Sequence, residues 1–213
     1  MSGDDPAGRD ERIRPGRGSA EAVDLPAILD RLAEPRSGTD DPEVAALFRA
    51  DQGDRTAAPI PPDIMERDAA RRARVLALLA AGRVRTPRDF FHAAIVFQHG
   101  SLLDHYRLAF ELARRAADAG APGARWLAAA ATDRLLMFSD RPQRFGTQYV
   151  QRDGRWVLYQ VDPATTDEVR AEWGVPPLAE ARRRADDLNR QGLHDRGGEG
   201  GEGGDGSRDE VGE

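Results

Sequence analysis

The sequence predicts a mainly α fold, in which antiparallel helical hairpins are arranged in a repeat-like way and one small β-hairpin is added. Apolar residues recur at helical spacing in most segments after residue 24, and short turns that contain glycine separate these segments. Residues 148–160 instead alternate around Asp153-Gly154, a dipeptide favoured in tight hairpin turns. We therefore expect one helical domain over residues 24–192 that includes a β-hairpin at 148–160.

The first helices are indicated by their caps and by their apolar stripes. Four apolar residues with the spacing of one helical face follow Asp24, a suitable N-cap: Leu25, Ile28, Leu29 and Leu32. Asp41-Pro42 supplies the next cap, followed by proline at the first helical position. We expect this second helix to fray near Gly53 and a longer helix to follow at about 63–81.

Later helices are marked by three candidate capping boxes, in which a hydroxyl residue precedes a carboxylate by three positions. These boxes are Thr86 to Asp89, Ser101 to Asp104, and Thr165 to Glu168. Gly100 would end the helix that Thr86 opens, and Pro122 would begin the helix that reaches the Asp133 region. A final helix is expected at 177–189.

Both ends have the composition of disordered chain. The first residues are rich in proline, glycine and charge, and the last are almost entirely Gly, Glu and Asp. We expect a disordered segment at 1–23 and a disordered acidic, Gly-rich tail at 193–213. No apolar run approaches the roughly 20 residues that cross a bilayer, and no signal-peptide centre follows Met1. We therefore predict a cytoplasmic protein with no membrane partner.

Composition excludes several kinds of chemistry. The chain has no cysteine, and its 31 basic residues are all arginines. Thiol nucleophiles, thiolate zinc sites, Schiff bases and the phosphate-binding loop that ends in Gly-Lys are therefore excluded. A net charge of -6 with interspersed signs argues against nucleic-acid binding. His92 and His99 lie about 10 Å apart along a helix, so we expect no metal and no cofactor.

Three polar segments supply the candidate site. Gln98 and His99 end an otherwise apolar helix, Asp133 and Arg134 follow an alanine run, and a polar block precedes the hairpin. From these segments we select eight candidate ligand-binding residues: Gln98, His99, Asp133, Arg134, Gln143, Arg144, Thr147 and Gln148. Their directional donors and acceptors suit a small polar ligand or a peptide.

Other interpretations of the same residues remain open. A metal-independent hydrolase or transferase would use His99 as a general base oriented by Asp133, with Arg134 or Arg144 stabilising an anion. A helical-repeat adaptor would bind a partner protein through its outer face. The structural alternative pairs Asp133 with Arg144 and uses the block, including Gln148, to tie the loop to the preceding helix.

The polar segments resemble a widespread bacterial family of unknown function. The hallmark of that family is a Gln-x-Tyr/Phe-Gly-Thr-Gln block after an Asp-Arg helix, matched here by residues 143–148 after Asp133-Arg134. Asp51-Gln52 with Arg55, and Gln98-His99, extend the resemblance, which covers about 44–188. It implies a mainly helical domain with a polar site shared by several segments. It implies no reaction, because the activity of the family is unassigned.

Overall fold

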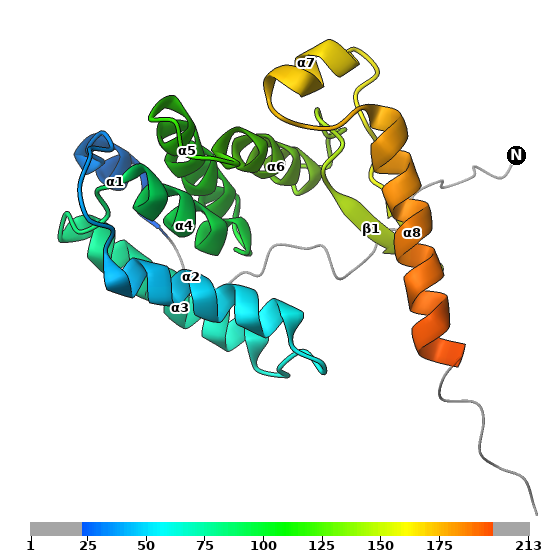
Figure 1. Cartoon of the computed structure of the whole chain (residues 1–213), viewed down its shortest axis with the longest axis horizontal. Helices are drawn as coiled ribbons and strands as arrows, with labels where there is room; N and C mark the ends of the chain where they lie inside the picture. Colours follow the sequence, from blue (N-terminus) through cyan, green and yellow to red (C-terminus); the bar gives the residue numbers. More distant parts are fainter. Residues whose placement is uncertain (1–22, 198–213) are drawn as a thin grey trace, which may run out of the picture.

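The computed structural model of the protein describes residues 23–197 and confirms the mainly α fold with one two-stranded antiparallel sheet (Figure 1). The elements in chain order are α1 (Leu25–Arg31), α2 (Pro42–Thr56), α3 (Ile64–Ala80), α4 (Pro87–Gln98), α5 (Leu103–Asp118), α6 (Ala124–Met137), β1 (Tyr149–Arg152), β2 (Arg155–Leu158), α7 (Asp167–Glu172) and α8 (Leu178–Gly197).

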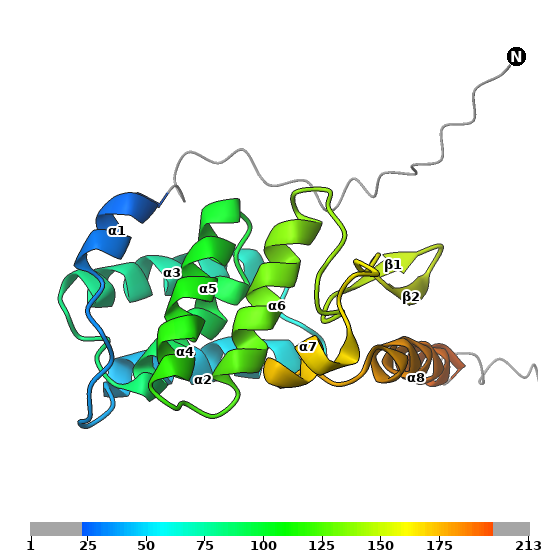
Figure 2. The same ribbon diagram turned by 90° about the horizontal axis from the view of Figure 1, so that it is seen from above.

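The helices form packed pairs, as the short turns predict. α2 and α3 lie side by side and run antiparallel, and α4, α5 and α6 pack consecutively next to them (Figure 1). Seen from above, α6 lies between α5 and the part of the molecule that holds the hairpin and α8 (Figure 2). α4 contacts both α2 and α6, the helices that carry Asp51-Gln52 and Asp133-Arg134.

The main core fills the space between α4, α5 and α6. Phe90 and Phe97 of α4 and Leu112 of α5 are fully buried. The alanine run at 128–131 of α6 is also buried, because small side chains let α5 and the hairpin region approach the helix closely. A smaller cluster joins α6 to α7, with the ring of Phe145 5.2 Å from that of Trp173.

The β-hairpin forms where the alternating pattern predicts it. Tyr149 pairs with Leu158, and the turn residues Asp153 and Gly154 have φ values of 51° and 73°. Two successive positive φ values are typical of the type I′ turn that suits the twist of a hairpin. α8 packs on β2, where the side-chain amide of Asn189 accepts from the Trp156 N–H (2.7 Å) and donates to its carbonyl (2.8 Å).

Most predicted caps are confirmed. Asp24 accepts from the Ala27 N–H, and Asp41 accepts from the N–H groups of the first turn of α2, where Pro42 occupies the first position. Thr86 and Asp89 form the complete reciprocal box at the start of α4.

Other boundary predictions were wrong. α5 begins without a side-chain cap from Ser101; the Nδ1 atom of His105 instead accepts from the N–H groups of Ser101 and Leu102. The N-cap of α7 is Thr166 rather than Thr165. α2 does not fray at Gly53 but continues to Thr56, because the two side chains that follow the glycine, Asp54 and Arg55, pair with α3.

The domain is slightly longer than predicted at both ends. Val23 is buried against the core, and α8 ends at Gly197, beyond the expected boundary at residue 192. The predictions of disorder for the tails otherwise fall on residues 1–22 and 198–213, outside the described residues. Across residues 23–197, no helix combines the length and the apolar character needed to span a membrane.

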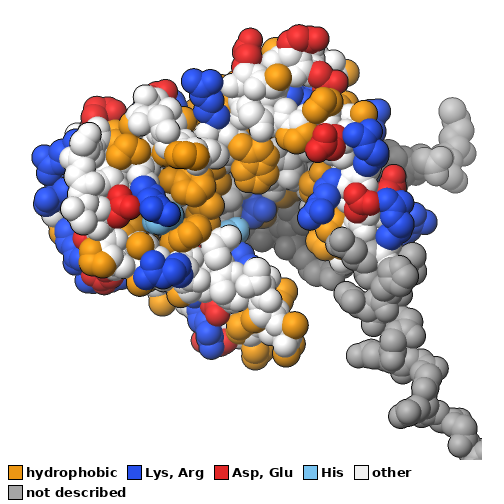
Figure 3. All heavy atoms as spheres, in the orientation of Figure 1, with side chains coloured by type: hydrophobic (Ala, Val, Ile, Leu, Met, Phe, Trp, Pro, Cys, Tyr) orange, Lys and Arg blue, Asp and Glu red, His pale blue; other side chains and the backbone are white. Residues whose placement is uncertain are grey.

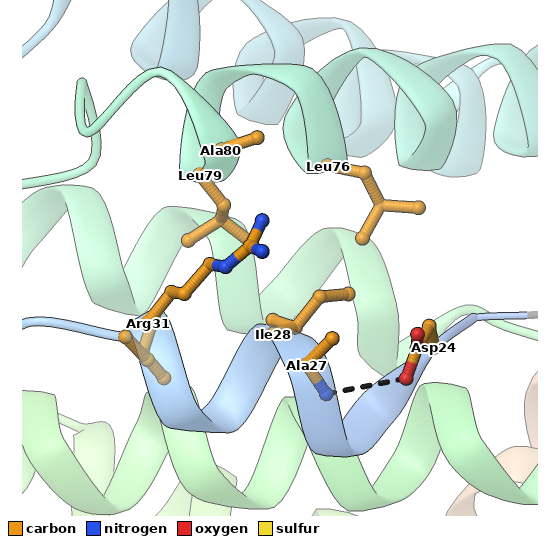
Figure 4. A pocket seen from close by; sticks show the side chains of 8 residues that line it. Asp24, Ala27, Ile28, Arg31, Leu76, Leu79 and Ala80 are labelled. Atoms are coloured by element: carbon orange, nitrogen blue, oxygen red, sulfur yellow. Dashed lines mark hydrogen bonds between the residues drawn. The ribbon is translucent and has the colours of Figure 1, made fainter.

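An apolar groove of about 270 Å³ lies between α1 and α3 (Figure 4). Ile28 of α1 and Leu76 and Leu79 of α3 line it, and Asp24 at its edge is occupied in capping Ala27. None of the predicted site residues lines this groove. The candidate site is therefore on another part of the molecule.

Candidate functional site

The buried carboxylate of Asp133 holds the polar block in place. Its Oδ1 atom accepts from the backbone N–H groups of Arg144 (2.7 Å) and Phe145 (2.8 Å). Its Oδ2 atom accepts from the N–H (3.0 Å) and the hydroxyl (2.8 Å) of Thr147. Burial raises the pKa of the Asp133 carboxyl, and these donated hydrogen bonds offset part of that increase. Both oxygens are thus saturated by the loop.

Gln143 fixes the same loop to the hairpin. Its amide group donates to the carbonyls of Gln148 (3.0 Å) and Tyr159 (2.8 Å), and its side-chain oxygen accepts from the Gln148 N–H (2.8 Å). Gly146 makes the turn between Gln143 and Gln148, and its φ of 83° would strain any residue with a side chain. We call Asp133, Gln143, Thr147 and Gln148 the clasp.

Arg144 does not form the ion pair with Asp133 that the structural alternative proposes. Its backbone N–H, not its guanidinium, contacts the carboxylate. The guanidinium lies over the ring of Phe145, 5.1 Å from the centroid. The clasp therefore depends on the backbone of the loop rather than on the charge of Arg144.

A second polar cluster surrounds the C-terminal end of α4. The last carbonyls of a helix lack partners within the helix and attract cations. Here the Gln98 carbonyl accepts from Arg134 Nη1 (3.1 Å) and the His99 carbonyl from Arg72 Nη1 (3.0 Å). The Gly100 carbonyl accepts from the Tyr106 hydroxyl (2.7 Å). Side chains from α3, α5 and α6 thus converge on one helix end.

His99 is oriented by a carboxylate from α2. Its Nδ1 atom lies 3.0 Å and 3.2 Å from the two carboxylate oxygens of Asp51. The Asp51 side chain is 1% exposed and also pairs with the guanidinium of Arg55 at 3.0 Å. Because an ionised carboxylate only accepts, Nδ1 carries the proton and Nε2 carries the lone pair in the neutral ring.

The environment keeps this imidazole neutral. Burial lowers the pKa of His99, the Asp51 carboxylate raises it in part, and the nearby guanidinium groups of Arg55 and Arg134 lower it further. Together these effects leave the pKa of His99 below its ordinary value of 6.5. At neutral pH, His99 therefore presents Nε2 as an acceptor.

Charged pairs between α2 and α3 hold Arg55 in position. Arg55 bonds both oxygens of Asp68, at 3.2 Å and 2.7 Å, and Asp68 also accepts from Arg71 (2.9 Å). Burial raises the pKa of Asp68, but the hydrogen bonds from Arg55 and Arg71 outweigh burial and leave that pKa lowered. Asp54 extends the network through Arg71.

Arg134 differs from the other arginines of this cluster. Its Nε atom donates to Gln148 Oε1 (2.9 Å) and its Nη1 to the Gln98 carbonyl, but it has no carboxylate partner among residues 23–197. Burial lowers the pKa of its guanidinium, and the charge of Arg55 adds to that effect. Its Nη2 atom has no hydrogen-bond partner among the described residues and is not buried, so Arg134 remains open to a further acceptor.

Two more polar atoms lack protein partners within the described part of the chain. The His99 side chain is 22% exposed, and its Nε2 atom makes no hydrogen bond. The Gln98 side chain is almost wholly buried, yet its Oε1 atom has no partner. We call Asp51, Arg55, Gln98, His99 and Arg134 the arginine–histidine site. Figure 3 shows a hollow between the helices and α8, where histidine and arginine side chains reach the surface.

The structure divides the predicted residues between these two clusters. Gln98, His99 and Arg134 come together at the arginine–histidine site, whereas Asp133, Gln143 and Thr147 belong to the clasp. Gln148 links the two, because its amide oxygen accepts from Arg134 while its amide nitrogen donates to Thr147 (3.0 Å).

The predicted pairing of His99 with Asp133 was wrong. The Asp133 oxygens are occupied by the loop, and the carboxylate beside His99 is that of Asp51. The sequence did contain a signal for Asp51, since Asp51-Gln52 with Arg55 is part of the family resemblance. The sequence contained no comparable signal for Arg72 or Tyr106, because each lies within an ordinary helical pattern.

No group of three or more His, Cys, Asp or Glu side chains within residues 23–197 is placed to hold a metal ion. The arginine–histidine site instead offers guanidinium donors, an amide and one imidazole. Such a set suits an anion or a hydroxyl rather than a cation.

Comparison with protein-family models, with curated proteins and with solved structures gives no match for this chain. The resemblance to a bacterial family remains a prediction from the polar segments.

Proposed function

We propose that this protein binds a small polar ligand that carries an anionic group, and that the arginine–histidine site receives it. The observation that carries this proposal is the guanidinium of Arg134, which is half-buried and has no carboxylate partner among the described residues. An anion at Nη2 would supply the missing countercharge.

The competing explanation is that Arg134 only caps α4 and ties down Gln148. Two of its nitrogen atoms do make these contacts. Neither contact uses Nη2, however, and neither neutralises the charge. The contacts instead fix the orientation of the guanidinium, which lowers the entropy lost when a ligand binds.

The neighbouring groups extend the site beyond a single charge. The Nε2 atom of His99, whose side chain is partly exposed, can accept a hydrogen bond from a ligand, whereas the unpaired Oε1 atom of Gln98 is enclosed by the protein. A ligand with an anionic group and a hydroxyl or amine would use both kinds of partner. This set of groups supports a small polar ligand over an extended peptide.

The adaptor alternative has less support. The exposed large apolar side chains of the described residues are Ile60 in the loop before α3, Met65 on α3 and Trp126 on α6, so they come from three separate segments. We further propose, from composition, that the protein is cytoplasmic and does not bind nucleic acid, since its net charge is -6.

Titration of the full chain with dimethyl phosphate, a stable monoanion, tests the proposal. We expect saturable binding by NMR shift changes, and an affinity at least about tenfold weaker in Arg134→Gln. The matched control is Arg88→Gln, because Arg88 is 73% exposed and only weakly paired. Equal affinity in the wild-type protein and Arg134→Gln, or no saturable binding, would contradict the proposal.

Arg134→Lys separates binding from folding, since it keeps the charge while losing the planar fork. We expect it to fold and to bind more weakly than the wild-type protein but more tightly than Arg134→Gln.

A further inference from the structure

We infer that the arginine–histidine site hydrolyses a small phosphodiester, with His99 as the general base and Asp51 as the residue that positions it. This inference rests on the proposed function, because Arg134 must first hold the anionic phosphate group.

The first step of the argument is the geometry of the imidazole. Asp51 receives Nδ1–H and is itself fixed by Arg55 and by the Gln52 amide (2.8 Å). The ring therefore has one tautomer and one orientation, with Nε2 directed away from Asp51. A base held in this way is ready to accept a proton from water or from a hydroxyl group.

The second step is the place of Arg134 relative to this base. Arg134 donates to the carbonyl of Gln98, the residue that precedes His99. This contact (3.1 Å) holds the guanidinium at the C-terminal end of α4, where His99 is the C-cap residue. An anion on Nη2 would thus lie beside the base.

The third step selects the substrate. A carboxylate bound by Arg134 is a poor electrophile, because electron donation from its two charged oxygens deactivates the carbon and neither oxygen is a good leaving group. A phosphodiester carries one negative charge and also has an electrophilic phosphorus atom. Among monoanions that a guanidinium holds, it is the class on which a neighbouring base can act directly.

The proposed step is balanced without a metal or a redox partner. His99 Nε2 takes a proton from water, the water oxygen forms a bond to phosphorus, and the bond to the leaving oxygen breaks. The imidazolium then returns the proton to the leaving oxygen. The products are a phosphomonoester and an alcohol, and Arg134 stabilises the charge on the non-bridging oxygens.

The charged groups around His99 come from three helices. Asp51 and Arg55 face it from α2, Arg72 binds its carbonyl from α3, and Arg134 approaches from α6. Asp51 stabilises the imidazolium that forms in the step, while Arg55 and Arg134 favour the neutral base beforehand. The rate should therefore fall on the acid side of neutrality, with a midpoint below 6.5.

The test measures hydrolysis of bis(p-nitrophenyl) phosphate by the full chain in the presence of a chelator. We expect release of p-nitrophenol to fall at least about 100-fold in His99→Gln. Dimethyl phosphate affinity in the same variant should change by less than about threefold. Arg88→Gln should hydrolyse at the wild-type rate.

The positioning role of Asp51 is tested by a measurement that loss of structure alone would not change. NMR titration of the His99 ring in Asp51→Asn should show its pKa moved lower, because the carboxylate raises that pKa in the wild-type protein. An unchanged pKa would contradict the positioning role. If Asp51→Asn does not fold, the His99→Gln result still decides the main claim.

The remaining outcomes separate the two proposals. If the wild-type protein binds dimethyl phosphate but hydrolyses the phosphodiester no faster than His99→Gln, the hydrolase inference is overturned and the proposed binding function stands. If the protein neither binds dimethyl phosphate nor hydrolyses the phosphodiester, both proposals are overturned. Hydrolysis of p-nitrophenyl acetate, but not of the phosphodiester, would overturn the assignment of substrate class.

Discussion

Two buried carboxylates, Asp133 and Asp51, have opposite surroundings. Asp133 accepts from three backbone N–H groups and one hydroxyl, all within residues 144–147. Among residues 23–197, the Asp51 carboxylate instead pairs with side chains, namely those of Gln52, Arg55 and His99. The first carboxylate shapes a loop, and the second orients functional groups.

The difference shows how to separate a structural cluster from a functional one. In the clasp, the polar side-chain atoms of Asp133, Gln143 and Gln148 all have partners in the protein. At the arginine–histidine site, contacts with the protein orient His99 and Arg134, while His99 Nε2 and Arg134 Nη2 have no partner among the described residues. A side chain that is fixed by some of its atoms while another polar atom lacks a partner is pre-organised to bind a ligand.

The clasp should be the larger contributor to stability. In Asp133→Asn, the new amide nitrogen must face two of the donors that the carboxylate now satisfies. We expect a loss of about 3 kcal/mol in the free energy of unfolding. Urea unfolding at neutral pH measures it, with Asp30→Asn at an exposed position of α1 as the control. A loss below about 1 kcal/mol would show that the clasp is not structural.

Gln148→Ala should have a smaller effect of the same kind. It removes partners of Arg134 and of the Ala130 carbonyl, while the backbone contacts of residue 148 remain. We expect a loss of about 1 to 3 kcal/mol, measured by urea unfolding. Near-wild-type stability together with lost anion binding would instead move Gln148 into the arginine–histidine site.

The pH dependence of stability should identify His99. Because its folded-state pKa lies below its unfolded value of 6.5, the unfolded chain takes up a proton first as the pH falls. The free energy of unfolding should therefore decrease below pH 6.5, within the window down to the folded-state pKa.

Urea unfolding from about pH 7.5 to about pH 5 measures this slope, which should be shallower in His99→Gln. Part of the slope should remain, because burial also lowers the pKa of His92. Identical slopes in the two proteins would contradict the account of His99.

The sequence predicts the helices well because their signals are local. Asp24, Asp41 and Thr86 cap helices that contacts over a few residues determine. It fails at Ser101, where His105 from the next turn supplies the acceptor. The site is predicted only in part, because Asp51 and His99 are brought together by the packing of α2 on α4, which local patterns do not show.

The affinity of dimethyl phosphate for Asp133→Asn and Arg134→Gln, each confirmed as folded, tests the central distinction most directly. If the clasp is structural and the arginine–histidine site binds the ligand, Asp133→Asn should bind within about threefold of the wild-type protein and Arg134→Gln at least about tenfold more weakly. Equal losses in the two variants, or a greater loss in Asp133→Asn, would contradict this account.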